Sequence, residues 1–533
     1  IATLRQDMER ARLPAARARA VLAGAGAPAG TEATEIKAIV EDYFAKMDMA
    51  DYLNEIDTDS DITTSLTATR VEASARRTIS THLMKLSGVE TLSAAGTSAA
   101  EVRTPKLEVA LVLDVSGSMS GTKLSNLKGA AKEFVSTLLT SSRAGDTVIS
   151  LVPFSWSATP PQTVFNTLAV DQTHEYSTCL KFRDNDFSHA TLTSGASAIS
   201  QGTPVDQMIY TSVFGNFKDL NPSWRSCFTD AYMEFLPYSI SETALHAKID
   251  SLQADGNTSG HQGMNWGAAL LDPTFRKVSA ALIASGEVDS QLSNVPADYN
   301  EPETLKVVVV MTDGANTTSY FFDKSSPRYR GSHSDLYLLE YQQMEFQYGF
   351  ARYNVDRKYY DAWAEAYCQY GWFKCVYEAT GDVVSAYYLR DGSRYYDVEA
   401  RQWIADTELD AIRASEGFIS EEQLTWEEAW GLMSPRFYSE ITGNWGAWND
   451  YVGSEYLTGE GKDARMLSVC SATRTQGTVV YSIGFEVPAG GRAERVLTDC
   501  ASSANHYYPA STTDISAAFS SIASNVKNLR LTQ

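Results

Sequence analysis

The sequence has little of what most zinc proteins and hydrolases depend on. Its 533 residues include only 7 His and 6 Cys, and no CxxC pair occurs, so a structural zinc site is not expected. GxSxG and HExxH patterns are missing, and so are a P-loop and a GxGxxG in a strand–turn–helix setting. We therefore expect a protein that is not an enzyme.

Basic residues and long apolar runs are also scarce. Asp and Glu number 66 against 44 Lys and Arg, a formal net charge of -22. Such a polyanion repels nucleic acids and anionic membrane surfaces, so neither is expected as a partner. No run of about 20 apolar residues occurs. The chain opens on Ile1 without a signal-peptide pattern, so we expect any membrane anchor to lie in a segment before Ile1.

The even number of cysteines fits a set of three disulfides, although six cysteines can pair in many ways. We favour pairing between neighbours along the chain. These pairs are Cys179 with Cys227, Cys368 with Cys375, and Cys470 with Cys500. Disulfides would place the protein outside the cytosol, in the periplasm, on the cell surface or secreted. Buried free thiols are the alternative.

Four short aliphatic runs predict the centre of the fold. They lack the polar–apolar alternation of a half-exposed strand, as strands buried on both faces of a parallel sheet do. They are residues 107–114, 148–154, 305–314 and 478–485. Apolar residues at helical spacing, such as Leu127 with Phe134 and Phe519 with Ile522, indicate helices between and after them. This βαβ pattern predicts a doubly wound α/β core.

The remaining segments divide around this core. We expect a helical segment at 1–50, a small β-rich or α+β subdomain at 51–105, and the core at 106–315 and 465–533, interrupted by insertions at 155–241 and 316–464. The first two form an N-terminal α+β region. The second insertion is rich in Trp and Tyr, too apolar for a flexible loop, and should fold as a subdomain.

The strongest chemical pattern is DVSGS, which places Asp114, Ser116 and Ser118 at the end of the first aliphatic run. Open α/β sheets bind ligands outside the carboxyl ends of their strands, and one carboxylate with two hydroxyls suits a hard divalent cation. Thr258 lies on a loop, GNTSG, that opens a predicted helix, and Asp313 follows the third aliphatic run. With Thr258 and Asp313 added, a cation site explains the DVSGS motif better than a helix N-cap without a metal does.

These three pieces, in this order, resemble the von Willebrand factor A domain and its metal-ion-dependent adhesion site (MIDAS). The resemblance implies a Rossmann-like fold in which Asp114, Ser116, Ser118, Thr258 and Asp313 surround one divalent cation, Mg²⁺ in preference to Ca²⁺ or Mn²⁺. Two carboxylates neutralise a dication, and the protein supplies about five of its six positions. The vacant position would accept a carboxylate from a partner protein's Asp or Glu.

Longer stretches resemble the TadG-type proteins, bacterial envelope proteins encoded with tight-adherence (Flp) pilus machinery. The stretches are 107–119, 256–273, 470–485, 499–511 and the closing LRLTQ, and 17–25 resembles the segment after their single membrane helix. Residues 316–464 match nothing in that family. The resemblance implies a metal-dependent adhesion or assembly protein of the cell envelope, linked to pilus assembly, with homo-oligomers allowed. The alternative is a structural envelope or filament subunit whose metal only staples the loops.

Two other candidates are weaker. The alternating carboxylates of Asp57, Asp59 and Asp61 could hold Ca²⁺, but they lack the Gly and Glu of an EF-hand loop, so a solvated turn is favoured. His261 could serve as a general base for Ser116 or Ser118 in a hydrolase. No orienting acid is identifiable, however, and a hydroxyl committed to a metal is a poor nucleophile.

The second insertion leaves the core directly after Asp313. We therefore expect it to overhang the metal site, with Trp426 and Trp448 on the same side as Asp114. Aromatic rings at such a rim suit recognition of a protein or glycan. The alternative is that these rings form the insertion's own core.

Overall fold

The computed structural model describes residues 33–47, 49–64, 68–80, 88, 90–103, 106–142, 145–192, 204–208, 220, 225–301, 304–348, 351–355, 376–414, 417–452 and 455–532. Two predicted features therefore lie outside the described residues: the part of the helical segment expected at 1–50 that precedes residue 33, and the pair Cys368 with Cys375.

The core is a six-stranded sheet in the order β20-β19-β10-β4-β5-β9. Its strands are β4 (Lys106–Asp114), β5 (Thr147–Phe154), β9 (Leu236–Ser239), β10 (Thr304–Thr312), β19 (Val479–Phe485) and β20 (Tyr507–Ala510). All four predicted aliphatic runs are strands of this sheet. The paired strands are parallel except β9, which runs antiparallel to β5 at one edge.

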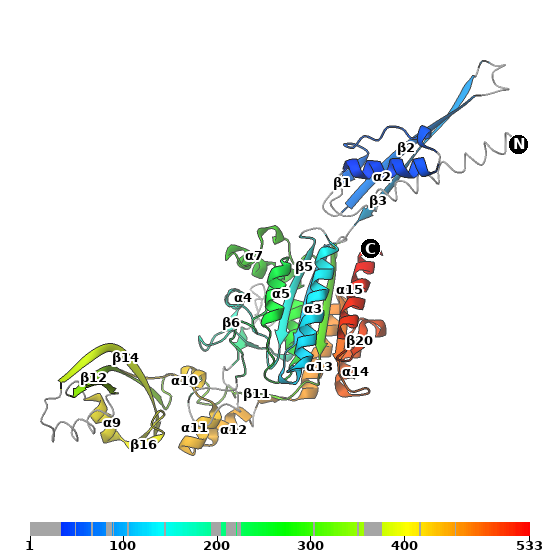
Figure 1. Ribbon diagram of the computed structural model, residues 1–533. Helices are drawn as coiled ribbons and strands as arrows, with labels where there is room; N and C mark the ends of the chain where they lie inside the picture. The colour runs from blue at the N-terminus through cyan, green and yellow to red at the C-terminus, as the bar shows by residue number, and fades with distance from the viewer. Residues whose placement is uncertain are drawn as a thin grey trace.

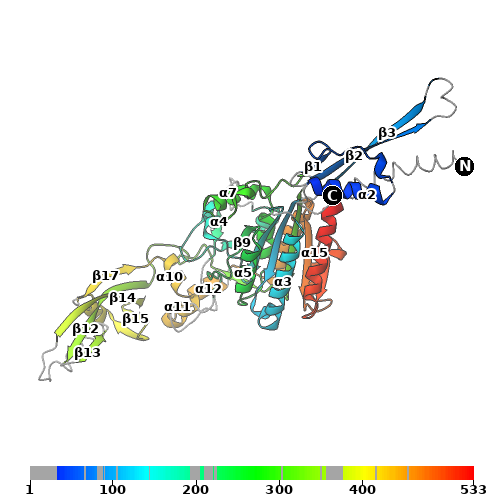
Figure 2. The same ribbon diagram turned by 45° about the horizontal axis from the view of Figure 1, so that its top comes forward.

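Helices cover both faces of the sheet (Figures 1 and 2). One face carries α3 (Thr122–Thr140), α5 (Glu242–Ser251) and α15 (Ile515–Thr532), and the other α6 (Gly260–Ala269), α7 (Arg276–Ala284), α13 (Gly459–Thr475) and α14 (Arg492–Cys500). Along β4, Leu111 and Leu113 pack into the first layer and Ala110 and Val112 into the second, because successive side chains of a strand point to opposite faces. The chain is therefore mixed α/β, as predicted.

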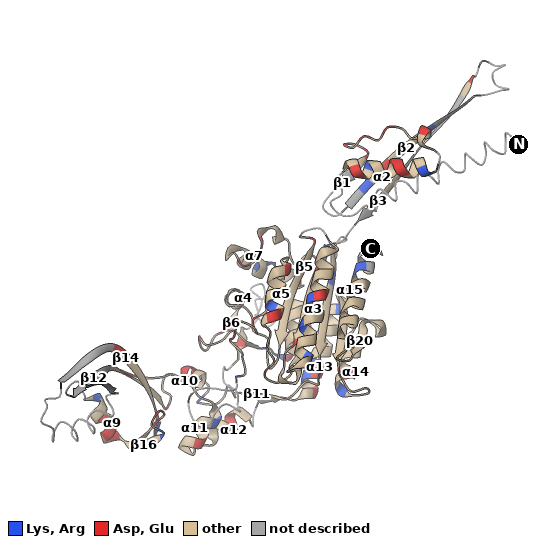
Figure 3. Cartoon of the chain, viewed as in Figure 1, with Lys and Arg blue, Asp and Glu red and all other residues tan. Residues whose placement is uncertain are grey.

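The N-terminal unit stands away from the core (Figure 1). It contains α2 (Ala33–Lys46), β1 (Ile62–Thr64), β2 (Ala68–Ser80) and β3 (Thr91–Arg103), with the strands in the antiparallel order β1-β2-β3. Ile36, Val40 and Phe44 recur at helical spacing and pack on the sheet residue Val71. Both α2 and α3 contain acidic as well as basic residues (Figure 3), so the strong net negative charge is not concentrated on these helices.

The described residues of the first insertion form one α-helix and three short strands before the chain reaches β9. These are α4 (Gln162–Thr167), β6 (Val170–Asp171), β7 (Leu180–Lys181) and β8 (Val205–Gln207). The insertion returns to the core sheet at β9, before its predicted end at residue 241. The disulfide Cys179–Cys227 links its two halves, and Cys470–Cys500 joins α13 to α14. Two of the three predicted disulfides are thus confirmed.

The second insertion leaves the core through a two-stranded ribbon and builds its own sheet. The ribbon is β11 (Ser319–Phe321) with β18 (Glu455–Leu457). The sheet contains β12 (Leu336–Tyr348), β13 (Ala351–Val355), β14 (Val376–Asp391), β15 (Arg394–Asp397), β16 (Gln402–Ala405) and β17 (Phe418–Gln423). Its described residues also form the helices α9 (Asp406–Arg413), α10 (Trp426–Leu432), α11 (Pro435–Thr442) and α12 (Gly446–Val452). Separate apolar clusters make it a subdomain with its own core.

Short 3₁₀ turns complete the described structure: η1 (Ala50–Tyr52), η3 (Gly117–Met119), η4 (Asp184–Phe187), η5 (Pro273–Phe275), η6 (Ser290–Leu292) and η7 (Ala504–His506). Among the helices in the described part of the chain, none combines the length and the apolar character that crossing a membrane requires. The N-terminal unit and the sheet of the second insertion lie at opposite ends of the core (Figures 1 and 2).

Candidate functional site

The candidate site begins where two neighbouring parallel strands end. β4 ends at Asp114 and β10 at Thr312, and the two strands pair in register up to Leu113 and Met311. Thr312 Oγ1 donates a hydrogen bond to Asp114 Oδ2 at 2.5 Å, and Ser116 N donates to Asp114 Oδ1 at 2.8 Å. The Asp114 carboxylate is therefore fixed at both oxygens.

The other predicted residues join Asp114 in one connected network. Ser116 Oγ lies 3.1 Å from Ser118 Oγ and 3.2 Å from Thr258 Oγ1. Ser118 Oγ donates to Asp313 Oδ1 at 2.6 Å. Three loops that are far apart in the sequence thus bring five oxygen-bearing side chains to one edge of the sheet.

Backbone contacts hold the loops of Ser116 and Thr258 together. Gly117 N donates to Gly256 O at 2.8 Å, and Asp255 N donates to Val115 O at 2.9 Å. Gly256 has a φ of +76°, and a Cβ there would lie 2.8 Å from the ring of Phe228. A glycine is needed at this position because the backbone is left-handed and the space is already filled.

The acidic side chains at the site are only partly neutralised by basic ones. Asp114 is fully buried, and its pKa is raised to about 6, mainly because burial disfavours the charged carboxylate; the hydrogen bond from Thr312 opposes this rise and the neighbouring Asp313 carboxylate contributes to it. Lys123 Nζ lies 2.7 Å from Asp313 Oδ2 and 3.5 Å from Glu486 Oε2. Lys123 is therefore paired with two carboxylates, and the buried Asp114 adjoins the same network without an ion pair to any residue that the structure describes, so an additional cation would be stabilised here.

The donor set fits a hard divalent cation. Among the described residues, no group of three or more His, Cys, Asp or Glu side chains could hold a metal ion, so the hydroxyls are essential to any site. Oxygens at about 2.0–2.1 Å from an octahedral Mg²⁺ lie about 2.9 Å from one another. The neighbouring oxygens here are hydrogen-bonded to one another at 2.6, 3.1 and 3.2 Å, distances that lie on either side of that value.

Several residues around the site were not predicted from the sequence. Thr312 could have been noticed, since it precedes Asp313 directly. Lys123 of α3 contacts Asp313, and Glu486, directly after β19, contacts Lys123. Lys462 of α13 is fully buried and donates to Ser259 Oγ at 2.6 Å; burial lowers its pKa to about 7. No sequence signal marks this contact, because 203 positions separate its partners.

The two weaker candidates show no comparable arrangement. Within the acidic segment, Asp57 N donates to Asp61 Oδ2 and Asp59 N to Asp57 Oδ1, both at 2.9 Å, which is a self-contained turn. His261 is buried and stacks on Phe187 with ring centroids 5.3 Å apart. Neither ring nitrogen has a hydrogen-bond partner in the described part of the chain, and burial holds its pKa well below the usual range.

The aromatic residues of the second insertion pack mainly on one another. Trp426 stacks on Trp430 at 5.2 Å, and both contact Tyr438 edge-on. Trp445 and Trp448 lie against the Arg436 guanidinium at 5.1 and 5.3 Å. Trp426 and Trp430 therefore belong to the insertion's own core, the alternative raised for them above. It is the first and last residues of the insertion, rather than these rings, that contact the loops of the candidate site.

No protein-family model and no curated protein sequence matches this chain. Solved structures similar to it include the vWF domain of the type V pili tip protein Mfa5 from Porphyromonas gingivalis, at 14% identity and a TM-score of 0.32, covering 81% of this chain and 97% of that one. Another is the pilus adhesin SpaC from Lactobacillus rhamnosus GG, at 11% identity and a TM-score of 0.28, covering 88% of this chain and 33% of that one.

A third is the pilus adhesin RrgA from Streptococcus pneumoniae, at 13% identity and a TM-score of 0.28, covering 89% of this chain and 48% of that one. The chain thus spans about a third of the SpaC chain and about half of the RrgA chain. At these TM-scores and identities, the likeness by itself assigns neither a family nor a function.

Proposed function

We propose that this protein is a metal-dependent adhesion or assembly protein of a bacterial cell envelope, built on a doubly wound von Willebrand factor A domain and linked to tight-adherence pilus assembly. Asp114, Ser116, Ser118, Thr258 and Asp313 would hold one divalent cation, preferably Mg²⁺. The cation would bind an acidic side chain of a partner protein.

The observation that carries this proposal is the connected set of oxygens at the ends of β4 and β10. Their spacings of 2.6–3.2 Å and the buried carboxylate of Asp114 suit a hard dication. Two carboxylates balance its charge, and five donors leave one of six positions for a ligand from outside. The disulfides Cys179–Cys227 and Cys470–Cys500 favour a location outside the cytosol.

A second candidate is a structural subunit in which the cation only staples the loops. It is favoured by the hydrogen bonds that already link the three loops, together with the ion pair from Lys123 to Asp313. The two candidates differ in one respect. An adhesion site must admit a carboxylate from outside, whereas a staple need not.

Mn²⁺ provides a test because it is paramagnetic and also accepts oxygen ligands. The EPR signal of free Mn²⁺ measures affinity, and water-proton relaxation measures access of solvent to the bound ion. We expect the wild type to bind one Mn²⁺ per chain with enhanced relaxation, and glutarate to reduce that enhancement. Asp114→Ala should abolish binding, whereas Asp57→Ala, in the acidic turn, should not.

Each outcome separates the alternatives. Binding that ignores glutarate favours the staple. Binding that survives Asp114→Ala, or that is lost in Asp57→Ala, contradicts the proposed site.

A further inference from the structure

The loop that carries Thr258 is held by the two ends of the second insertion. Thr258 O accepts hydrogen bonds from Thr317 N at 3.1 Å and from Thr317 Oγ1 at 3.3 Å. Lys462 Nζ lies 3.4 Å from the same oxygen and donates to Ser259 Oγ at 2.6 Å. The chain enters the insertion at Thr317 and leaves it just before Lys462, so both ends of the insertion meet on the loop.

Further bonds fix these two ends to each other. Asn316 Oδ1 accepts from Gly260 N at 2.7 Å, and Asn316 Nδ2 donates to Asp463 Oδ1 at 2.8 Å. Arg492 Nε lies 3.0 Å from Asp463 Oδ2, and its guanidinium also donates to Asn316 O. We call this group, Asn316, Thr317, Lys462, Asp463 and Arg492, the clamp. Neither end can move alone without leaving polar groups unpaired.

Most of the clamp is buried, and its Arg492 side chain is 31% exposed. Ser259 and Lys462 are fully buried, and Asn316 and Asp463 nearly so. A Cβ on Gly459 would collide with Asn316 O and with the Arg492 guanidinium, so glycine is required there for the two ends to approach. Buried polar groups are costly to separate, which makes the clamp a stiff connection.

The ribbon begins immediately beyond the clamp. β11 and β18 pair antiparallel, with Ser319 opposite Leu457 and Phe321 opposite Glu455. This ribbon leads to the helices α10–α12 and then to the distal sheet (Figure 1). A displacement of the subdomain is therefore passed along two hydrogen-bonded strands to the residues that hold Thr258.

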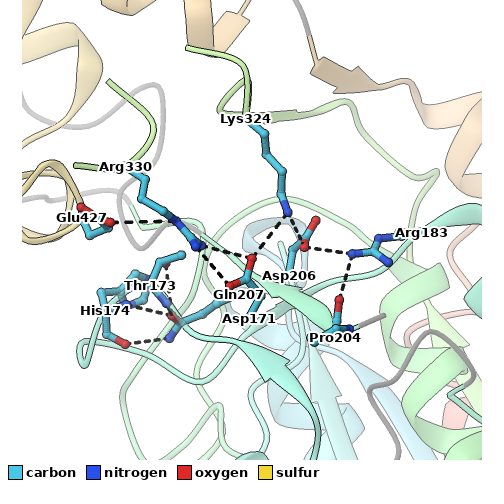
Figure 4. Close-up of polar contacts among 10 residues, drawn as sticks. All are labelled: Asp171, Thr173, His174, Arg183, Pro204, Asp206, Gln207, Lys324, Arg330 and Glu427. Atoms are coloured by element: carbon cyan, nitrogen blue, oxygen red, sulfur yellow. Dashed lines mark hydrogen bonds and ion pairs between the residues drawn. The ribbon is translucent and has the colours of Figure 1, made fainter. Parts of the chain in front are cut away.

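The subdomain has a second attachment, which is more exposed. Ion pairs join it to the first insertion (Figure 4): Lys324 Nζ lies 2.5 Å from Asp206 Oδ1, and Arg330 lies 3.1 Å from Asp171 Oδ2. The side chains of Lys324, Arg330 and Asp171 are 37–42% exposed. Such exposed pairs are weakened by salt, and buried contacts such as Ser226 Oγ with Tyr451 Oη at 3.3 Å also join the two insertions.

We propose that the second insertion regulates the cation site by setting the position of Thr258 through the clamp. Lys462 and Asn316 are then positioning residues, and the inference rests on the proposed function above. Coupling between two sites is reciprocal. A partner or a mechanical load on the insertion changes cation affinity, and the cation in turn orders the ribbon.

The test compares Lys462→Met with the matched control Lys306→Met. Lys306 is also buried and also bridges a side chain and a carbonyl, Glu108 Oε2 at 2.7 Å and Leu271 O at 2.6 Å, but at the start of β10, the end of the strand remote from Asp313. We expect Lys462→Met to weaken Mn²⁺ binding, measured by EPR, at least tenfold. Lys306→Met should change it less than twofold, although both lower the melting temperature.

A milder pair keeps the test decisive if Lys462→Met does not fold. Arg492→Ala removes half-buried contacts of the clamp, and Arg474→Ala removes equivalent bonds to Asp499 O and Ala501 O elsewhere. We expect Arg492→Ala to weaken Mn²⁺ binding several-fold and Arg474→Ala to leave it unchanged.

Hydrogen exchange distinguishes a positioning role from a purely structural one, because only coupling to the cation site makes amide exchange in the ribbon depend on Mn²⁺. We expect Mn²⁺ to slow amide exchange in residues 317–321 and 455–463 of the wild type and of Lys306→Met, but not of Arg492→Ala. Two results would overturn this inference while leaving the proposed function intact. One is that both clamp variants bind Mn²⁺ as tightly as the wild type does. The other is that the wild type binds Mn²⁺ but shows no change in amide exchange. A wild type that binds no Mn²⁺ overturns the proposed function and the inference with it.

Discussion

Replacing Asp114 by Asn should make the cation-free protein more stable, although it removes a residue at the centre of the site. The Asp114 carboxylate is fully buried, and its pKa is raised from 3.8 to about 6. Since one pKa unit corresponds to about 1.4 kcal/mol, the folded state loses as much as about 3 kcal/mol at neutral pH by keeping this charge. Asn has nearly the same shape and no charge.

The sign of the effect depends on pH. The pKa of Asp114 in the folded state lies above its value in the unfolded chain, so the cost is fully present above about pH 6. It fades as the pH falls through that value, and it vanishes below about 3.8, where both states are protonated. The advantage of Asp114→Asn should therefore shrink over this window.

Calorimetry in EDTA and in excess Mg²⁺ provides the assay. In EDTA at pH 7.5, we expect the core of Asp114→Asn to melt several degrees above the wild type. With Mg²⁺ at about 100 times its dissociation constant, the wild type should gain about 2.7 kcal/mol and the variant almost nothing.

The control is Asp272→Asn. Asp272 is buried as well, but its carboxylate accepts three hydrogen bonds, from Thr274 N at 2.9 Å, Thr274 Oγ1 at 2.5 Å and Tyr299 Oη at 2.8 Å, against the two described above for Asp114. The Lys306 ammonium also attracts its charge, so its replacement should destabilise the protein under both conditions. If Asp114→Asn melts below the wild type in EDTA and still responds to Mg²⁺, the electrostatic reasoning about this site is wrong.

Three further predictions concern the scaffold. Cys500→Ser opens the disulfide to Cys470, which closes 30 residues, and should lower stability by about 2–4 kcal/mol in unfolding by denaturant. Gly263→Ala places a Cβ 2.5 Å from the ring of Phe154 and should cost about 1–3 kcal/mol by overpacking; an unchanged melting temperature would contradict the close approach of α6 to the sheet. Trp430→Ala removes a ring from the insertion's core and should cost about 3–5 kcal/mol there, seen as earlier proteolysis of the insertion while the core resists.

The central strands were predictable because a strand that is buried on both faces needs an uninterrupted run of apolar residues. Runs such as VVVV in β10 and LVL in β4 contain no polar position, since both sides of each strand are covered by helices. β9 was missed and assigned to the first insertion. Its four residues, LPYS, form a short antiparallel edge strand and carry no aliphatic run.

The site itself was only partly predictable. Asp114, Ser116 and Ser118 form a local motif at a strand end, and Thr258 and Asp313 lie in short patterns of their own. No sequence pattern indicates the residues of the clamp. Lys462 and Asp463 occupy the first turns of a helix, where charged residues normally face solvent. Only the return of the chain from the second insertion buries them against Thr258 and Asn316.

The most direct measurement is anomalous diffraction from crystals grown with Mn²⁺. We predict a single strong peak within coordination distance of oxygens from Asp114, Ser116, Ser118, Thr258 and Asp313, some of them reached through water, with a water or a neighbouring carboxylate at the remaining position. No peak at that place, or a peak at another group of carboxylates such as the turn at Asp57, would contradict the account.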